Sequence, residues 1–149
     1  MRRHAVRLAL GPVLTLLAVS GCGGSSVEAY CSQLRADRIE LADIVGSGSP
    51  TALLGNLPLL RGLGDKAPED LADEWQTLLS ALEGLDRALD DADVKPSAFV
   101  GGKPPAGVGA ADRKAIADAA EEIRSEDVVA AAGGIEQQGR DVCKVNLGL

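Results

Sequence analysis

The sequence predicts an all-α protein: a small antiparallel bundle of four or five helices, joined by one disulfide and interrupted by one long loop rich in glycine and proline. Apolar residues recur at spacings of three and four along most of the chain, which is the period of a helix with one buried face. No segment shows the alternation of a half-buried strand. The length of 149 residues allows one domain.

The first 26 residues differ in composition from the rest of the chain. Residues 1–7 carry three arginines, residues 8–19 form an apolar run, and Ser20 and Gly21 precede Cys22. Basic, apolar and small residues in this order are typical of a secretory signal peptide. An apolar helix over 8–19 would be about 18 Å long, short of the roughly 30 Å hydrocarbon core of a bilayer, so we do not expect a permanent transmembrane span.

The segment 17–22, Leu-Ala-Val-Ser-Gly-Cys, resembles the lipobox of bacterial lipoproteins. The resemblance implies a signal peptide over 1–21, cleavage before Cys22, and a diacylglyceryl group on the Cys22 thiol. Two acyl chains anchor a protein where one does so only marginally. We therefore expect a lipid-anchored protein on the extracytoplasmic face of the cell membrane, with 22–26 as a tether and 27–149 as the folded domain. Ordinary secretion with an unmodified Cys22 is the alternative.

Cleavage would also change the charge of the chain. Loss of three arginines takes the basic residues from 15 to 12 against 22 acidic residues, so the net charge falls from −7 to −10. His4 and Met1 would leave as well, and the chain has no other histidine or methionine. Because so acidic a surface repels phosphates, nucleic acid is not an expected partner.

Cys31 and Cys143 remain once Cys22 is assigned to lipid. An even pair in an exported chain predicts a disulfide, which would join the first helix to the last. Metal ligation would need further ligands, with only carboxylates available once histidine is absent, and thiol redox chemistry usually uses a CxxC pair, which is missing. We expect a structural disulfide, with no metal and no cofactor.

The first predicted helix covers about residues 27–45. Its buried face would consist of Val27, Cys31, Leu34, Leu41 and Val45. Arg38 interrupts this stripe, and we expect its alkyl stem to lie along it.

Two further helices are predicted before residue 94. Ser49 and Pro50 suit the N-cap and first position of a helix that buries leucines at 53, 54, 57, 60 and 63, and Pro58 should kink or divide it. The next helix begins at about Pro68, and its apolar positions form the clearest seam in the chain: Leu71, Trp75, Leu78, Leu82, Leu85 and Leu89. The place of Trp75 on this seam favours core packing over contact with a cofactor.

Residues 94–109 contain three prolines and four glycines, so helix is not expected there. A loop of this length is either functional or flexible, and we expect a flexible connection. Helical spacing resumes over 110–124, with a buried side made of Ala115, Ile116, Ala119 and Ile123. Ser125 then predicts the N-cap of a last helix that buries Val128, Ala132, Ile135, Gly139 and Val142.

Over most of its length after Cys22, the chain resembles a group of small exported actinobacterial proteins. The features that carry this resemblance are Tyr30-Cys31 on the first helix, Trp75 followed by Leu78, and a final Cys143, together with a composition rich in alanine, glycine and leucine. The resemblance supports the helical fold and implies no activity.

Catalysis is not expected. A Ser-His-Asp or Cys-His unit needs an imidazole, which the chain would lack after cleavage. Asp90, Asp91 and Asp93 lack the other ligands of a calcium loop, and Glu121 and Glu122 suit a solvated helix face.

The function expected from the sequence is that of a non-catalytic interaction module, held on the membrane by its lipid, that contacts another protein of the cell envelope. The alternative is a carrier that binds a small apolar ligand between the helices or beneath the 94–109 loop. A leucine-lined internal cavity of about 300 Å³ or more would favour the carrier. A filled core with an exposed apolar patch would favour the protein partner.

Overall fold

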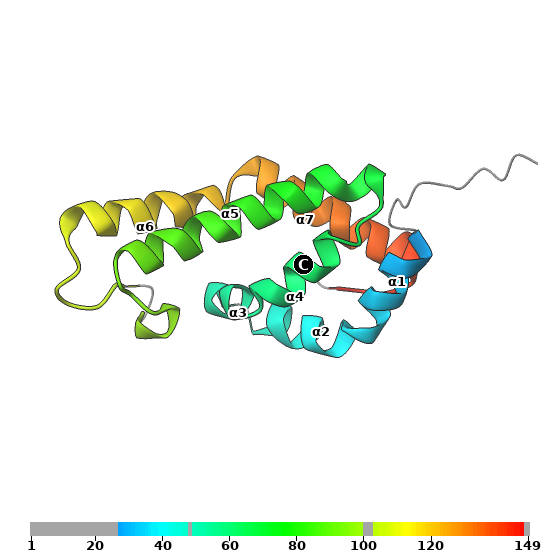
Figure 1. The fold of residues 1–149 in the computed structure, drawn as a ribbon, viewed down its shortest axis with the longest axis horizontal. Coiled ribbons are helices and arrows are strands. Elements are labelled where there is room, and N and C mark those ends of the chain that lie inside the picture. Colours follow the sequence, from blue (N-terminus) through cyan, green and yellow to red (C-terminus); the bar gives the residue numbers. More distant parts are fainter. Residues whose placement is uncertain (1–26, 48, 100–102, 148–149) are drawn as a thin grey trace, which may run out of the picture.

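A computed structural model describes residues 27–47, 49–99 and 103–147, and these residues form a helical bundle (Figure 1). The predicted signal peptide, the acylation site at Cys22 and the tether lie outside the described residues. Within those three ranges, no helix combines the length and the apolarity needed to cross a bilayer.

The described residues contain seven α-helices, more than the four or five expected. They are α1 (Val27–Ala36), α2 (Arg38–Gly46), α3 (Pro50–Gly55), α4 (Leu57–Gly64), α5 (Ala72–Asp91), α6 (Ala110–Glu122) and α7 (Glu126–Gln138). Three short helical turns complete the chain: η1 (Glu69–Leu71), η2 (Pro96–Ala98) and the π-helical η3 (Gly139–Cys143). The higher number arises because the first two expected helices are each divided in two.

The long helix α5 organises the bundle (Figure 1). Helices α6 and α7 follow one another back along α5, and both pack against it. Helices α3 and α4 pack against another side of α5, while α1 lies at one end and contacts η3. The seam predicted for α5 and η1 is confirmed, since its six apolar residues are all buried.

The single helix predicted over 27–45 is wrong, because the chain bends at Asp37 (φ −90°, ψ 1°). The Asp37 carboxylate accepts a hydrogen bond from Gln33 Nε2 at 2.8 Å, and Arg38 Nη1 donates to the Arg35 carbonyl oxygen at 3.1 Å. Arg38 is therefore exposed at the bend, and its stem does not lie along the core.

The bend also changes which residues are buried in this region. Tyr30 and Ile44 join Cys31, Leu34 and Leu41 in the core. The predicted end positions of the stripe are wrong: the side chain of Val27 is 40% exposed and that of Val45 is only half-buried.

The predictions for the chain that follows α2 are confirmed, except that Leu53 is half-buried. The Ser49 hydroxyl accepts a hydrogen bond from the Thr51 amide at 3.3 Å, as an N-cap does. The division falls at Asn56, and Pro58 lies in the first turn of α4, where a proline needs no amide hydrogen.

The beginning of the last helix is as predicted, and its end is not. Ser125 Oγ accepts from the Val128 amide at 3.4 Å and caps α7. Val142 was expected in the core but is 45% exposed, because η3 is a π-turn. The wider turn shifts the phase of the helix, so Cys143 is the residue that faces inward.

Two more positions differ from the expected pattern. Ala115 is exposed, and Ile116 is the buried residue of α6. After η3, residues 144–147 turn back towards the centre of the bundle (Figure 1), with the Val145 amide bonded to the Gly139 carbonyl oxygen at 2.9 Å. Val145 and Leu147 are buried, and a Cβ on Gly139 would lie only 3.2 Å from the Val145 oxygen.

Candidate functional site

The predicted disulfide between Cys31 and Cys143 is present, with a Cα–Cα distance of 4.9 Å. It joins α1 to the end of η3, and Arg35 Nε donates to the Cys143 carbonyl oxygen at 3.2 Å. These links hold residues 144–147 against the bundle, since Lys144 follows the disulfide directly. The disulfide therefore fixes the position of Leu147, which lines a cavity described next.

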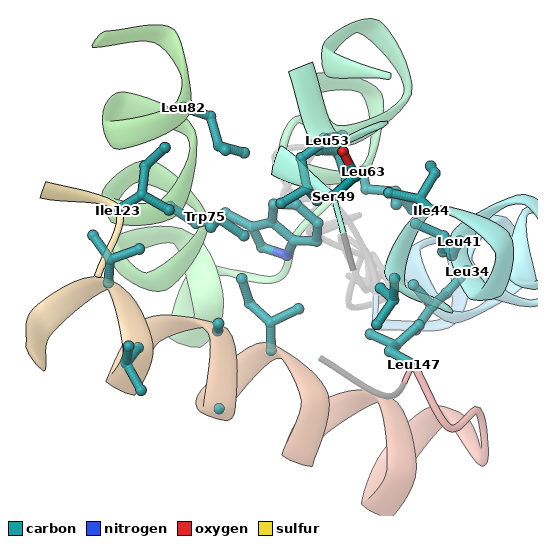
Figure 2. A pocket seen from close by; sticks show the side chains of 18 residues that line it. Leu34, Leu41, Ile44, Ser49, Leu53, Leu63, Trp75, Leu82, Ile123 and Leu147 are labelled. Carbon is teal, nitrogen blue, oxygen red and sulfur yellow. The ribbon is translucent and has the colours of Figure 1, made fainter. Parts of the chain in front are cut away.

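An apolar cavity of about 510 Å³, here called the leucine pocket, lies between α5 and α7 on one side and α2, α3 and α4 on the other (Figure 2). This volume is above about 300 Å³, the lower limit for typical small-molecule sites. The side chains that line it are Leu34, Leu41, Ile44, Val45, Ser49, Leu53, Leu60, Leu63, Trp75, Leu78, Leu82, Ile123, Val128, Val129, Ala132, Gly133, Ile135 and Leu147.

The leucine pocket has a deep floor and an exposed edge. Leu63, Leu82 and Ile135 have no exposed surface and form part of the floor. Val129, on the edge, is 61% exposed, and Leu53 is half-buried. A ligand could therefore enter past Val129 without unfolding of the bundle.

The leucine pocket offers almost no polar groups. Among the described lining residues, Ser49 is the only one whose side chain carries a hydroxyl or a charge. The indole of Trp75 lies at the centre of the pocket (Figure 2), but its Nε1 donates to the Tyr30 hydroxyl at 3.1 Å. The indole N–H is thus satisfied, and Trp75 presents ring carbons to a ligand.

Tyr30 supports Trp75 from behind the leucine pocket. Its side chain is completely buried, and the two rings meet edge to face with centroids 6.4 Å apart and an interplanar angle of 77°. Burial raises the pKa of the Tyr30 phenol, while the hydrogen bond from Trp75 acts in the opposite direction. The phenol is therefore neutral at physiological pH and can accept from the indole.

Small residues on α7 explain why this space is not filled. The helix carries three alanines and two glycines over 130–134, and Ala132 and Gly133 face the leucine pocket. A Cβ on Gly133 would meet no atom within 4 Å. These small side chains leave space in the leucine pocket that larger apolar residues would occupy.

A second cavity of about 390 Å³, here called the loop pocket, lies beneath the first part of the 94–109 loop. It is lined by Ser49, Thr51, Leu54, Leu85, Leu89, Pro96, Ser97, Phe99, Ile116, Ala120 and Arg124. The described part of the loop is thus packed over α3 and α5 and contributes the wall of a cavity. Ser49 lines both pockets.

The acidic residues singled out from the sequence line neither pocket. Asp90, Asp91 and Asp93 are exposed near the end of α5, and Glu121 and Glu122 are exposed on α6. Over the described parts of the chain, no three histidine, cysteine or acidic side chains gather as metal ligands would.

No protein-family model, curated protein or solved structure matches this chain. The similarity to exported actinobacterial proteins and to lipoproteins stays a prediction from the motifs quoted above. The sequence named the space between the helices and the space beneath the 94–109 loop as the places where a carrier could bind its ligand, but it did not identify the residues that line either pocket. The available signal was the run of small residues over 130–134, opposite a seam that carries the bulky Trp75.

Proposed function

We propose that this chain is an exported, lipid-anchored carrier that binds a small apolar molecule in the leucine pocket. The observation that supports the proposal is a cavity of about 510 Å³ whose lining is alkyl and aromatic except for Ser49. An apolar lining with few polar groups is what small-molecule sites share. The lining of the leucine pocket offers no array of acid, base and nucleophile for catalysis.

The size of the leucine pocket argues against a closed, dry void. Removing core atoms costs about 24 kcal/mol per 1,000 Å³ of empty cavity, so a closed void of about 510 Å³ would cost about 12 kcal/mol. Typical domains are stable by only about 5–15 kcal/mol in total. A cavity of this size is therefore more compatible with a fold that is open to solvent or filled by an apolar molecule than with a dry void.

The proposed anchor would place the leucine pocket where apolar molecules are found. Cys22 precedes α1 by only four residues, Gly23 to Ser26, which span at most about 14 Å. A lipid on Cys22 would hold the domain close to the membrane surface. An apolar ligand that leaves the bilayer would then travel a short distance to reach the leucine pocket.

The alternative, an interaction module for a protein partner, has less support. The large hydrophobic side chains that are exposed in the described residues are Val27, Ile39, Val129 and Val142, and each belongs to a different element. Val129 also lies on the edge of the leucine pocket. Val27 and Val142 lie on α1 and η3, which contact each other, but two valines are a small surface for a protein partner.

Trp75 provides the test, because the chain contains one tryptophan and it lines the leucine pocket. The full chain with Cys22→Ala, which removes the acylated thiol and the need for detergent, is titrated with a single-chain fatty alcohol brominated in mid-chain. Bromine quenches an indole only at contact distance, so we expect quenching that saturates at one molecule per chain. The same alcohol without bromine serves as the control.

The affinity follows from the area that a chain would bury. About ten methylenes at about 0.8 kcal/mol each contribute about 8 kcal/mol, and association costs about 4 kcal/mol or more. The net of about 4 kcal/mol corresponds to a Kd of about 1 mM. Quenching that is absent, or that rises without saturation, would contradict the proposal.

A further inference from the structure

The leucine pocket and the loop pocket lie along one stripe of α5. Trp75, Leu78 and Leu82 line the first, and Leu85 and Leu89, the next positions on the same stripe, line the second. The two cavities, of about 510 and 390 Å³, are thus consecutive parts of one apolar surface.

Pairs of neighbouring residues separate the two cavities. On α3, Leu53 lines the leucine pocket and Leu54 lines the loop pocket. At the junction of α6 and α7, Ile123 lines the first and Arg124 the second. Ser49 belongs to both, so the boundary between the cavities passes over its side chain.

Polar groups gather on the loop-pocket side of this boundary. The hydroxyls of Ser49 and Thr51 are 2.6 Å apart, and Arg124 lines the same cavity. Arg124 pairs with Glu121 at 3.5 Å, and both side chains are mostly exposed, so this pair is weak and the guanidinium can donate to another group. The remaining lining of the two cavities is mainly apolar.

We infer that the ligand is an uncharged amphiphile with two hydrocarbon chains, of the diacylglycerol type, with one chain in each pocket and its polar linking group at Ser49, Thr51 and Arg124. This inference rests on the proposed function and specifies the class of ligand. Two apolar cavities with a polar boundary match a molecule whose polar group lies between two chains. We do not expect the ligand to carry a phosphate group. Among the described residues, Arg124 is the one cation that lines either pocket, and Glu121 already neutralises part of its charge.

The test compares two ligands on the full chain carrying Cys22→Ala, with Trp75 quenching as the readout. One is the brominated single-chain alcohol, and the other is a medium-chain diacylglycerol with brominated chains. Each buried methylene raises affinity about fourfold, so even four methylenes in the loop pocket would give about 200-fold. We expect the diacylglycerol to bind at least about 100-fold more tightly than the alcohol.

Filling the loop pocket should remove this advantage. Ala120 lines that cavity, and Ala120→Phe should weaken the diacylglycerol about 100-fold while leaving the single-chain alcohol within twofold. Binding of the alcohol shows in the same sample that the variant is folded. Ala117→Phe, at an exposed position on the same helix, is the matched control and should change neither affinity. Ser97→Phe, at the loop side of the cavity, is a second variant expected to act like Ala120→Phe.

The outcomes separate this inference from the proposed function. If neither ligand quenches Trp75, both the proposed function and the two-chain ligand are wrong. If the alcohol binds but the diacylglycerol binds no more tightly, or keeps its affinity in Ala120→Phe and Ser97→Phe, the carrier stands and the two-chain ligand is wrong. Because the protein is acidic, we expect a diacylglycerol phosphate to bind at least about tenfold more weakly than the diacylglycerol. Equal affinity of the two ligands would contradict the inference that the linking group is uncharged.

Discussion

Partly filling the leucine pocket from α7 should stabilise the protein while weakening its proposed ligand binding. Ala132→Leu adds three carbon atoms to a half-buried side chain that lines the pocket. Complete burial of these carbons would contribute about 2.4 kcal/mol at about 0.8 kcal/mol each. Because the position is only half-buried, we expect about half of this, an increase of about 1 kcal/mol in the free energy of unfolding. Alanine and leucine differ little in helix propensity, so packing dominates the change.

Urea unfolding of ligand-free protein measures this change, with Trp75 fluorescence as the signal. Ala130→Leu is the matched control, since Ala130 is exposed on the same helix, and its stability should stay within about 0.5 kcal/mol of the wild type. Ala132→Leu should also weaken binding of the brominated alcohol, because part of the leucine pocket is filled, whereas Ala130→Leu should leave this affinity unchanged. A loss of about 1–3 kcal/mol in Ala132→Leu, the usual effect of overpacking, would show that the space in the leucine pocket is not available and would refute the reasoning.

Four further predictions follow from the core and the leader. Tyr30→Phe removes the acceptor of the buried Trp75 indole N–H and should lower the free energy of unfolding by about 1–3 kcal/mol in urea titrations; an unchanged midpoint would show that the bond contributes nothing. Because burial raises the pKa of Tyr30, wild-type stability should be complete below about pH 10 and fall as the pH rises further, and Tyr30→Phe should lack this part of the decline. Replacing Cys31 and Cys143 together by alanine should cost about 5 kcal/mol, given their separation of 112 residues, and mass measurement without reductant should find no free thiol on either in the wild type. Cys22→Ala should release the protein from membranes into the soluble fraction, and a variant that stays membrane-bound would exclude lipid as the anchor.

The seam on α5 could be predicted because its six apolar residues follow the helical period without interruption. The caps at Ser49 and Ser125 could be predicted because a hydroxyl before a helix bonds to a nearby amide, whatever the tertiary structure. The disulfide could be predicted because two cysteines remain once Cys22 is assigned to lipid, and an even pair in a chain expected to be exported favours a disulfide. Local chemistry and strict periodicity were therefore sufficient for these elements.

The errors arose where longer-range packing decides the structure. Periodicity alone does not show the bend at Asp37, where side-chain hydrogen bonds of Asp37 and Arg38 accompany the change of direction. It also assumes 3.6 residues per turn, so it places Val142 inside, whereas the π-turn of η3 places Cys143 there. No local pattern indicates that the segment ending at Leu147 returns to the core.

The leucine pocket could not be derived from the sequence for a related reason. The spacing of leucines shows which residues face inward, but it does not show whether their volumes fill the space between helices. The small residues Ala132 and Gly133 of α7 line the same cavity as Trp75 of α5, which only the packing of the two helices reveals. Likewise, the proline-rich composition of the 94–109 loop gave no sign that Phe99 would close a second cavity.

Native mass spectrometry of the full chain, released from its own membrane, would test the proposed carrier most directly. We expect one non-covalently bound apolar molecule per chain, lost on gentle activation, in addition to the covalent mass on Cys22. The Ala132→Leu chain should keep the covalent mass and carry less of the bound molecule than the wild type. A wild-type mass explained by polypeptide and anchor alone, even after incubation with excess diacylglycerol and single-chain alcohol, would contradict ligand binding in the leucine pocket.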